Sequence, residues 1–259
     1  GVDTGNGTAI KCPPGKYNSI TGMTTLLSCL DCPIGFYCPL GSIDPFKYPC
    51  GNSTTWYCPL GSSHRLHVEE GYYAVLPILF TSEISLFTAS VVAGYGNTEV
   101  CPVGYFCISG IKYPCSAGRY GSIERSTNRS CSGICTAGWY CPDASITSRQ
   151  NICNDSSTYC PIGSGFPMNV KPGYYTYSFV EHNDTTSSHV DYQSTAYYTN
   201  EKICEPGFYC LHSGIRYKCP PGRFGNSYGM TNSSCSGSCV PGYFCKEGST
   251  NSTEYPCGH

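Results

Sequence analysis

The spacing of the cysteines constrains what this chain can fold into more than any other feature of its sequence. There are 21 cysteines, and their spacing repeats after about 103 residues, with eight cysteines in each repeat. The first cysteines of the successive repeats are Cys12, Cys29, Cys32, Cys38, Cys50 and Cys58, then Cys115, Cys131, Cys135, Cys141, Cys153 and Cys160, then Cys219, Cys235, Cys239, Cys245 and Cys257. The last two are Cys101 and Cys107, then Cys204 and Cys210. A fixed period of this length is typical of a tandem array.

The third repeat contains only five of its cysteines. By the spacing of the first two repeats, the sixth would fall beyond His259. We therefore expect one cysteine to have no partner within this sequence, and the sequence to be a slice of a longer array.

Cysteine density and glycosylation motifs together predict an extracellular protein. Cysteine makes up about 8% of the chain, which is near the level that signals a disulfide scaffold. Disulfides persist in oxidising compartments such as the cell exterior. Asn-x-Ser/Thr sequons, which accept N-linked glycans, occur at Asn6, Asn52, Asn128, Asn154, Asn183, Asn232 and Asn251. We expect a secreted or cell-surface glycoprotein that carries N-glycans.

Composition argues against several other classes of protein. The chain has 15 lysines and arginines and a net charge of −2, whereas binding to nucleic acid needs clustered cations. Its longest apolar run, residues 74–80, is far shorter than the ~20 residues that span a bilayer, so we expect no membrane-spanning segment. Large aliphatic residues are sparse, and modules of ~45 residues are too small for a sufficient apolar core. Disulfides should therefore stabilise the fold.

A seven-residue motif recurs five times, at residues 32–38, 101–107, 135–141, 204–210 and 239–245. Its pattern is Cys-x-x-Gly, two aromatic residues and Cys. The glycine can adopt the positive φ of a tight turn, and the aromatic residues can begin a short strand that covers a disulfide. The sequence thus predicts a small disulfide-rich fold, mostly β and irregular, built as an elongated tandem repeat.

Together with the preceding Cys-Pro-Pro-Gly-Lys-Tyr at residues 12–17, the motif resembles the ephrin-receptor-like cysteine-rich module, a relative of EGF-like and tumour-necrosis-factor-receptor-like knots. The resemblance implies extracellular tandem modules and no enzymatic activity. It does not cover the two long segments without cysteine. We therefore expect cysteine-rich modules at 1–58, 101–160 and 204–259, separated by inserts at 59–100 and 161–203.

The resemblance also implies a disulfide pattern, which spacing alone does not determine. The implied pairs are Cys12–Cys29, Cys32–Cys50, Cys38–Cys58, Cys101–Cys107, Cys115–Cys131, Cys135–Cys153, Cys141–Cys160, Cys204–Cys210, Cys219–Cys235 and Cys239–Cys257. An interleaved alternative joins Cys101 to Cys115 and Cys107 to Cys131. Both patterns leave Cys245 unpaired.

Each insert contains Gly-Tyr-Tyr, at residues 71–73 and 173–175. In the second insert, β-prone residues at 175–180 and 192–198 flank a polar tip, which predicts a β-hairpin. The first insert is apolar, and either forms a small local core or docks on another module or chain. Its candidate assembly interface comprises Tyr72, Val75, Leu76, Ile78, Leu79, Phe80, Leu86, Phe87, Val91 and Val92.

No group of residues suggests a catalytic or metal site. His64 and His67 lie in a stretch typical of a solvated turn. Cys29-x-x-Cys32 fits a structural disulfide pattern better than a zinc or redox pair, because its counterparts have a longer spacing. The segment that begins at Asp3 lacks the downstream acidic ligand of a calcium loop. We expect no enzyme, no metal and no cofactor.

Two functions fit these expectations. The first is a structural glycoprotein whose copies assemble head-to-tail into a filament or surface fibre. The alternative is the ectodomain of a receptor or adhesion protein that presents a ligand-binding face. The apolar first insert and the unpaired cysteine favour the first.

Overall fold

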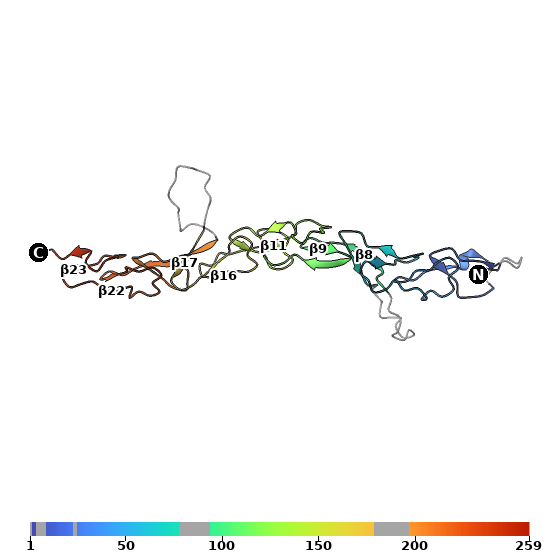
Figure 1. Cartoon of the computed structure of the whole chain (residues 1–259), viewed down its shortest axis with the longest axis horizontal. Helices are drawn as coiled ribbons and strands as arrows, with labels where there is room; N and C mark the ends of the chain where they lie inside the picture. Colours follow the sequence, from blue (N-terminus) through green and yellow to red (C-terminus); the bar gives the residue numbers. More distant parts are fainter. Residues whose placement is uncertain (1, 4–8, 23–24, 78–93, 179–196, 259) are drawn as a thin grey trace, which may run out of the picture. The chain divides into compact units, whose positions relative to one another are not determined.

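The structure is a computed structural model that describes residues 2–3, 9–22, 25–77, 94–178 and 197–258. The strands among these residues are two to four residues long and pair into twelve two-stranded antiparallel sheets (Figure 1). A single short 3₁₀ helix, η1 (Leu26–Ser28), lies just before Cys29 in this part of the chain. The predicted small disulfide-rich fold, mostly β and irregular, is confirmed.

The chain divides into two compact units. The first consists of Gly1–Pro114 with Ile123–Cys131, and the second of Cys115–Ser122 with Ser132–His259. In the first unit the strand pairs are β1 (Val2–Asp3) with β2 (Ala9–Ile10), β3 (Lys16–Tyr17) with β4 (Leu30–Asp31), β5 (Trp56–Tyr57) with β6 (Leu66–His67), β7 (Tyr72–Val75) with β8 (Asn97–Val100), and β9 (Tyr105–Ile108) with β10 (Ile111–Pro114).

In the second unit the strand pairs follow the same order along the chain. They are β11 (Arg119–Tyr120) with β12 (Gly133–Ile134), β13 (Trp139–Tyr140) with β14 (Asn151–Ile152), β15 (Thr158–Tyr159) with β16 (Met168–Asn169), β17 (Tyr174–Tyr177) with β18 (Asn200–Ile203), β19 (Phe208–Cys210) with β20 (Arg216–Lys218), β21 (Arg223–Phe224) with β22 (Gly237–Ser238), and β23 (Tyr243–Phe244) with β24 (Tyr255–Pro256).

The tight turns of the fold are encoded by Cys-x-x-Gly. Gly35, for example, has a φ of +84°, a region that residues with a Cβ rarely adopt. The following amide, that of Phe36, donates a hydrogen bond back to the Pro33 carbonyl at 3.2 Å. The chain thereby reverses within a few residues and returns towards its starting cysteine.

Successive turns are joined by backbone hydrogen bonds. In the first unit, Cys32 N–H donates to the Gly15 carbonyl and Gly15 N–H donates to the Cys38 carbonyl, both at 2.8 Å. The second unit has the equivalent bonds, from Cys135 to Gly118 at 2.9 Å and from Gly118 to Cys141 at 2.8 Å. These contacts use no side chain, so the spacing of the turns depends little on the residues between them.

Half-cystines make up most of the buried interior. Cysteines such as Cys32, Cys58 and Cys141 are 0% exposed. Apart from cysteines, the buried hydrophobic residues of the described ranges are Phe36, Val68, Tyr159, Val170 and Tyr175. An interior with so few large apolar side chains agrees with the expectation that disulfides stabilise the fold.

Cysteines pair more locally than the resemblance implied. Each seven-residue motif is closed by its own disulfide: Cys32–Cys38, Cys101–Cys107, Cys135–Cys141, Cys204–Cys210 and Cys239–Cys245. The implied pairs Cys32–Cys50, Cys38–Cys58, Cys135–Cys153, Cys141–Cys160 and Cys239–Cys257 are therefore wrong. The reason is the glycine turn, which brings the two ends of a motif to a Cα–Cα distance of 5.8 Å in the first copy, within the range for a disulfide.

The remaining cysteines also pair with a neighbour along the chain. Cys50 bonds to Cys58 and Cys153 bonds to Cys160. Cys12–Cys29 and Cys219–Cys235 form as implied, and Cys115 and Cys131, at the equivalent positions, are both disulfide-bonded. The interleaved alternative is wrong, because Cys101 bonds to Cys107.

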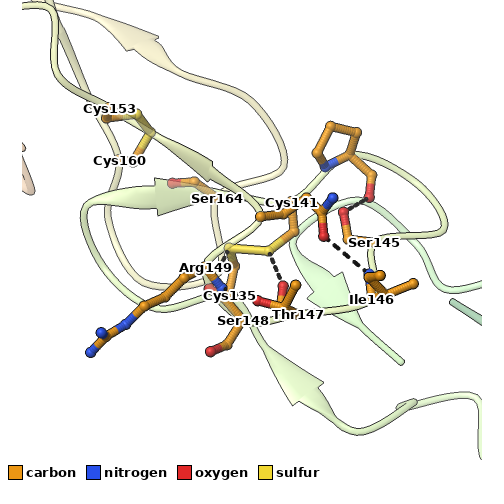
Figure 2. The surroundings of a disulfide bond; sticks show 12 residues. Cys135, Cys141, Ser145, Ile146, Thr147, Ser148, Arg149, Cys153, Cys160 and Ser164 are labelled. Carbon is orange, nitrogen blue, oxygen red and sulfur yellow. Dashed lines mark hydrogen bonds between the residues drawn. A yellow bond between two sulfur atoms is a disulfide. The ribbon is translucent and has the colours of Figure 1, made fainter. Parts of the chain in front are cut away.

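The Cys135–Cys141 bridge shows how the backbone encloses a disulfide (Figure 2). The carbonyl oxygens of Ser148 and Thr147 lie 3.1 and 3.5 Å from the sulfur atoms of Cys135 and Cys141, respectively. A disulfide sulfur carries no hydrogen, so these are sulfur–oxygen contacts and not hydrogen bonds. The loop between the two strands β13 and β14 thus covers the bridge with main-chain atoms.

Each insert is held at its base by a four-residue ladder, β7–β8 in the first and β17–β18 in the second. The return strand of the second insert is Asn200–Ile203, so its predicted placement at 192–198 is wrong. The reason is that Tyr197 and Tyr198 contact the cysteine-rich module instead. The Tyr197 ring packs on Trp139 at a centroid distance of 4.4 Å, and Tyr198 N–H donates to the Cys153 carbonyl at 2.8 Å. The tips of both inserts lie outside the described residues.

Candidate functional site

Cys257 is the one free cysteine of the described residues, and it is exposed. Cys245, which the implied pairing left free, is buried and bonded to Cys239, so that prediction is wrong. In the first repeat, the cysteine equivalent to Cys257 bonds to the next cysteine along the chain, as Cys50–Cys58. Closure of the seven-residue motif by its own bridge therefore moves the unpaired thiol from the fourth cysteine of the repeat to the fifth.

Five sequon asparagines lie in the described ranges, and all five are exposed: Asn52, Asn128, Asn154, Asn232 and Asn251. The other two predicted glycosylation sites, Asn6 and Asn183, lie outside these ranges. Exposure of the acceptor amide is what attachment of an N-glycan requires of the folded surface.

The sequons fall into two classes that sequence reasoning did not distinguish. At Asn128, Asn232 and Asn251, the side-chain oxygen accepts a hydrogen bond from the backbone N–H two residues later, at 2.9, 3.0 and 3.2 Å. At Asn52, the hydroxyl of the third sequon residue, Thr54, instead donates to the Ser109 carbonyl at 2.8 Å. The first class forms a local turn, whereas the Asn52 sequon is held by a distant part of its unit.

Three of the ten predicted interface residues lie in the described ranges. Tyr72 is half-buried beneath the Arg125 guanidinium, whose carbon lies 4.7 Å from the ring centroid. Val75 is half-buried, and Leu76 is 63% exposed. The others, Ile78, Leu79, Phe80, Leu86, Phe87, Val91 and Val92, lie outside the described residues.

Other aliphatic side chains are exposed at equivalent positions of the two units, which sequence reasoning missed. The exposed fractions are 60% and 64% for Ile20 and Ile123, 64% and 45% for Ile43 and Ile146, and 64% and 66% for Leu60 and Ile162. The signal in the sequence was the recurrence of a large aliphatic residue after the period of the cysteines. Conservation of the fold requires no apolar residue at these positions, because none of them is buried.

Stacked aromatic pairs are a second recurrent surface feature. The second aromatic residue of four motif copies stacks on a tyrosine of the returning segment, at centroid distances of 5.5 Å for Tyr37–Tyr48, 5.3 Å for Phe106–Tyr113, 5.5 Å for Tyr209–Tyr217 and 5.3 Å for Phe244–Tyr255. The fifth copy has Asn151 at the tyrosine position, paired with Tyr140 in the β13–β14 ladder.

A charged cluster surrounds Glu205 at the start of the fourth motif copy. Its carboxylate accepts hydrogen bonds from Tyr175 at 3.0 Å and Arg216 at 3.1 Å, and pairs with Lys202 at 2.8 Å. Burial by itself raises the pKa of Glu205, but the hydrogen bonds from Lys202, Arg216 and Tyr175 outweigh it and lower the pKa to about 2. The Arg216 guanidinium also lies over the rings of Tyr175 and Phe208, at 5.0 and 4.4 Å. This cluster braces the base of the second insert.

The first unit has a related cluster with the acidic group at a different position. Lys112 lies over the rings of Tyr73 and Tyr105, at 4.3 and 5.3 Å, and Glu99 accepts a hydrogen bond from the Tyr73 hydroxyl. A cation between two aromatic rings is thus common to both units, while the carboxylate that neutralises it has moved.

The histidines considered as a metal corner have ordinary surroundings. His64 Nδ1 shares a hydrogen bond with the Ser63 hydroxyl at 2.9 Å, and His67 packs edge-on against Trp56. Over the described ranges, no three His, Cys, Asp or Glu side chains are grouped so that they could hold a metal ion. In the same ranges no helix has the length and apolar character needed to cross a membrane.

Neither a protein-family model nor a curated protein sequence matches this chain. The resemblance to the ephrin-receptor-like module therefore stays a prediction, and the functional argument rests on the surface features described above.

Proposed function

We propose that this chain is an extracellular structural glycoprotein that associates with further copies into a filament or surface fibre. Its disulfides indicate an extracellular or secreted protein, because such bonds persist in oxidising compartments. We assign it no enzymatic activity, metal or cofactor.

The observation that supports assembly is the matched exposure of Ile20 with Ile123, and of Leu60 with Ile162, in the two units. Single exposed apolar residues are common on monomeric proteins. Aliphatic residues exposed at the same position of successive units are what a contact surface repeated along an array would produce. Water contact of such residues is unfavourable, and association with another copy would remove it.

Glycans would complete this surface. Only 12% of the residues are charged, a smaller share than keeps most bare surfaces soluble. The five exposed sequon asparagines would add hydrated sugar between the apolar positions. Association is then directed to the surfaces that the glycans leave uncovered.

Negative-stain electron microscopy of the secreted protein tests the proposal. We expect fibres with a regular repeat, which the double variant Ile20→Ser/Ile123→Ser shortens or abolishes. Leu27→Ser is the matched control, because Leu27 is 93% exposed but has no aliphatic equivalent in the other repeats. Isolated particles at every concentration of the unmodified protein would overturn the proposal.

The alternative function is the ectodomain of a receptor or adhesion protein. The exposed aromatic pairs support it, because Tyr113, Tyr217 and Phe244 are 40%, 37% and 45% exposed, and aromatic residues are enriched at binding sites. Isolated particles that bind cells, and that lose this binding in the variant Tyr113→Ala/Tyr217→Ala, would favour this function over assembly.

A further inference from the structure

The C-terminal module, residues 219–257, exposes positions that are buried in the two modules before it. Gly222 and Gly242 are exposed, whereas the equivalent glycines of the first two repeats are buried. Cys257 is exposed, whereas its equivalents Cys50 and Cys153 are only 1% and 2% exposed. Something that covers these positions in the earlier modules is therefore missing from the third.

In the first unit the covering segment is Cys58–Ser62, of sequence Cys-Pro-Leu-Gly-Ser. Cys58 forms a disulfide with Cys50, and its carbonyl accepts a hydrogen bond from Gly35 N–H at 2.8 Å. The Ser62 hydroxyl donates to the Pro59 carbonyl at 2.6 Å, which closes the segment into a turn.

The glycine and serine of this covering segment make the remaining contacts. Gly61 N–H donates to the Cys32 carbonyl at 2.8 Å, and the Ser62 carbonyl accepts from Cys38 N–H at 2.9 Å. The Gly61 carbonyl also lies against Gly15, so closely that a Cβ at Gly15 would overlap it.

The second unit repeats every one of these contacts with Cys160–Ser164, of sequence Cys-Pro-Ile-Gly-Ser. Cys160 bonds to Cys153, and the Gly163 carbonyl lies against Gly118. The three hydrogen bonds are Gly138 N–H to the Cys160 carbonyl at 2.7 Å, Gly163 N–H to the Cys135 carbonyl at 2.9 Å, and Cys141 N–H to the Ser164 carbonyl at 2.9 Å. One segment chemistry thus covers this surface twice.

The C-terminal module holds the same surface open. Gly242 N–H, Cys245 N–H and the Cys239 carbonyl have no backbone hydrogen-bond partner among the described residues. No described atom outside the neighbouring residues comes within 4 Å of the place that a Cβ at Gly222 would occupy. The thiol of Cys257 is free.

This open surface is already folded into the shape that the earlier modules have. Cys239 N–H donates to the Gly222 carbonyl at 3.1 Å, Gly222 N–H to the Cys245 carbonyl at 3.0 Å, and Cys257 N–H to the Gly242 carbonyl at 2.9 Å. Binding would therefore require little reordering of the module, which lowers its cost.

We propose that residues 219–257 form a docking site for a polypeptide segment of sequence Cys-Pro-(Leu/Ile)-Gly-Ser. The segment's cysteine carbonyl accepts from Gly242 N–H, its glycine N–H donates to the Cys239 carbonyl, and its serine carbonyl accepts from Cys245 N–H. Its glycine carbonyl rests on Gly222. The two segments of this sequence in the chain itself are already engaged, so the partner brings one that is free.

The docked segment is then bonded covalently to Cys257. When its cysteine arrives as a mixed disulfide with glutathione, the Cys257 thiolate attacks the segment's sulfur. The new sulfur–sulfur bond forms as the old one breaks, and glutathione leaves as a thiolate that takes up the proton lost by Cys257. No net oxidation occurs in this exchange.

The test uses the whole chain and the peptide N-acetyl-Cys-Pro-Leu-Gly-Ser-amide, supplied as its glutathione mixed disulfide in a glutathione buffer. Intact mass and peptide mapping give the equilibrium constant for the Cys257–peptide disulfide. The matched control peptide has alanine in place of glycine, which disfavours the positive φ that Gly61 adopts at +77°. We expect at least a tenfold larger constant for the glycine peptide, and slower hydrogen exchange at the Gly242 and Cys245 amides.

Every change is made in the peptide, so a folding defect of the protein cannot imitate the result. Equal constants for the two peptides would show that Cys257 is only an exposed thiol and would overturn the proposal. A Cys257-linked dimer that the peptide does not displace would overturn it as well, because the occupant would then be a second copy. Docking does not require fibres, so this experiment and the electron microscopy can fail independently.

Discussion

At the residue scale, the glycine of a Cys-x-x-Gly turn has two separable roles. Its positive φ closes the turn, and its missing Cβ lets a second turn pack directly on it. Gly118 needs both, because the Gly163 carbonyl lies against it, whereas Gly222 has a similar φ, +81° against +87°, and no such neighbour.

This difference predicts the cost of adding one methyl group. We expect Gly222→Ala to lose about 1 kcal/mol of unfolding free energy, the cost of an L residue in the left-handed region. Gly118→Ala should lose at least about 2 kcal/mol more, because its Cβ overlaps a backbone oxygen that cannot move aside easily. Denaturant unfolding with the disulfides intact measures both, and equal losses would contradict the packing role.

Glu205 predicts a pH dependence at the same scale. Its pKa of about 2 lies below the ordinary 4.5, so its interactions stabilise the fold fully above pH 4.5. That contribution is lost as the pH falls from 4.5 towards 2, and it amounts to at most on the order of 3 kcal/mol.

Glu205→Gln should therefore be less stable than the unmodified chain at pH 6, with the difference shrinking towards zero at pH 2. Denaturant unfolding across this pH range measures it. The exposed Glu124 supplies the control variant Glu124→Gln, for which we expect little difference at any pH. A Glu205→Gln difference that is independent of pH would rule out the carboxylate as its source.

At the element scale, the stacked aromatic pairs show how a two-stranded ladder of two to four residues gains stability. Such ladders are marginal by themselves, and a cross-strand aromatic pair adds roughly 0.5–1.5 kcal/mol. The β13–β14 ladder lacks the pair, because Asn151 lies opposite Tyr140.

We expect Asn151→Tyr to supply this missing pair and to raise the free energy of unfolding by roughly 0.5–1 kcal/mol. Asn151→Ala is the control for loss of the amide, and should not stabilise the chain. Denaturant unfolding compares the two, and near-ultraviolet circular dichroism reports the new stacking. A tyrosine variant no more stable than the alanine variant would show that the stack contributes nothing in this ladder.

At the scale of the whole molecule, stability depends on sulfur. The interior of both units consists mainly of disulfides enclosed by backbone, with few large apolar side chains. A disulfide that closes a loop as short as seven residues still contributes roughly 2 kcal/mol, so the bridges together outweigh the net stability of a typical domain.

We expect the native protein to react with one equivalent of alkylating agent, at Cys257, and the fully reduced protein to have lost its cooperative thermal transition. Mass spectrometry after alkylation verifies complete reduction by 21 added groups, one for each cysteine. Reoxidation should restore the transition, which controls for damage by the reductant. A reduced chain that keeps its thermal transition would contradict the disulfide-based interior.

Local chemistry made part of this structure predictable from sequence. The Cys-x-x-Gly turns, the short strands after them and the disulfide-rich class follow from residues within a few positions of one another. The base of each insert was predicted as a hairpin, but the partner of Tyr174–Tyr177 was misplaced, because Tyr197 and Tyr198 are held by contacts with residues near Trp139 and Cys153. Those contacts join positions far apart in the chain.

The sequence by itself determined where the chain turns, since a turn needs only a glycine free of a Cβ and its immediate neighbours. Only the tertiary structure decided which cysteines meet, which thiol is left over and which glycines are covered. A disulfide requires two Cα atoms about 6 Å apart, and burial requires another segment on top. Both depend on how successive turns stack, and spacing alone contains no information about that.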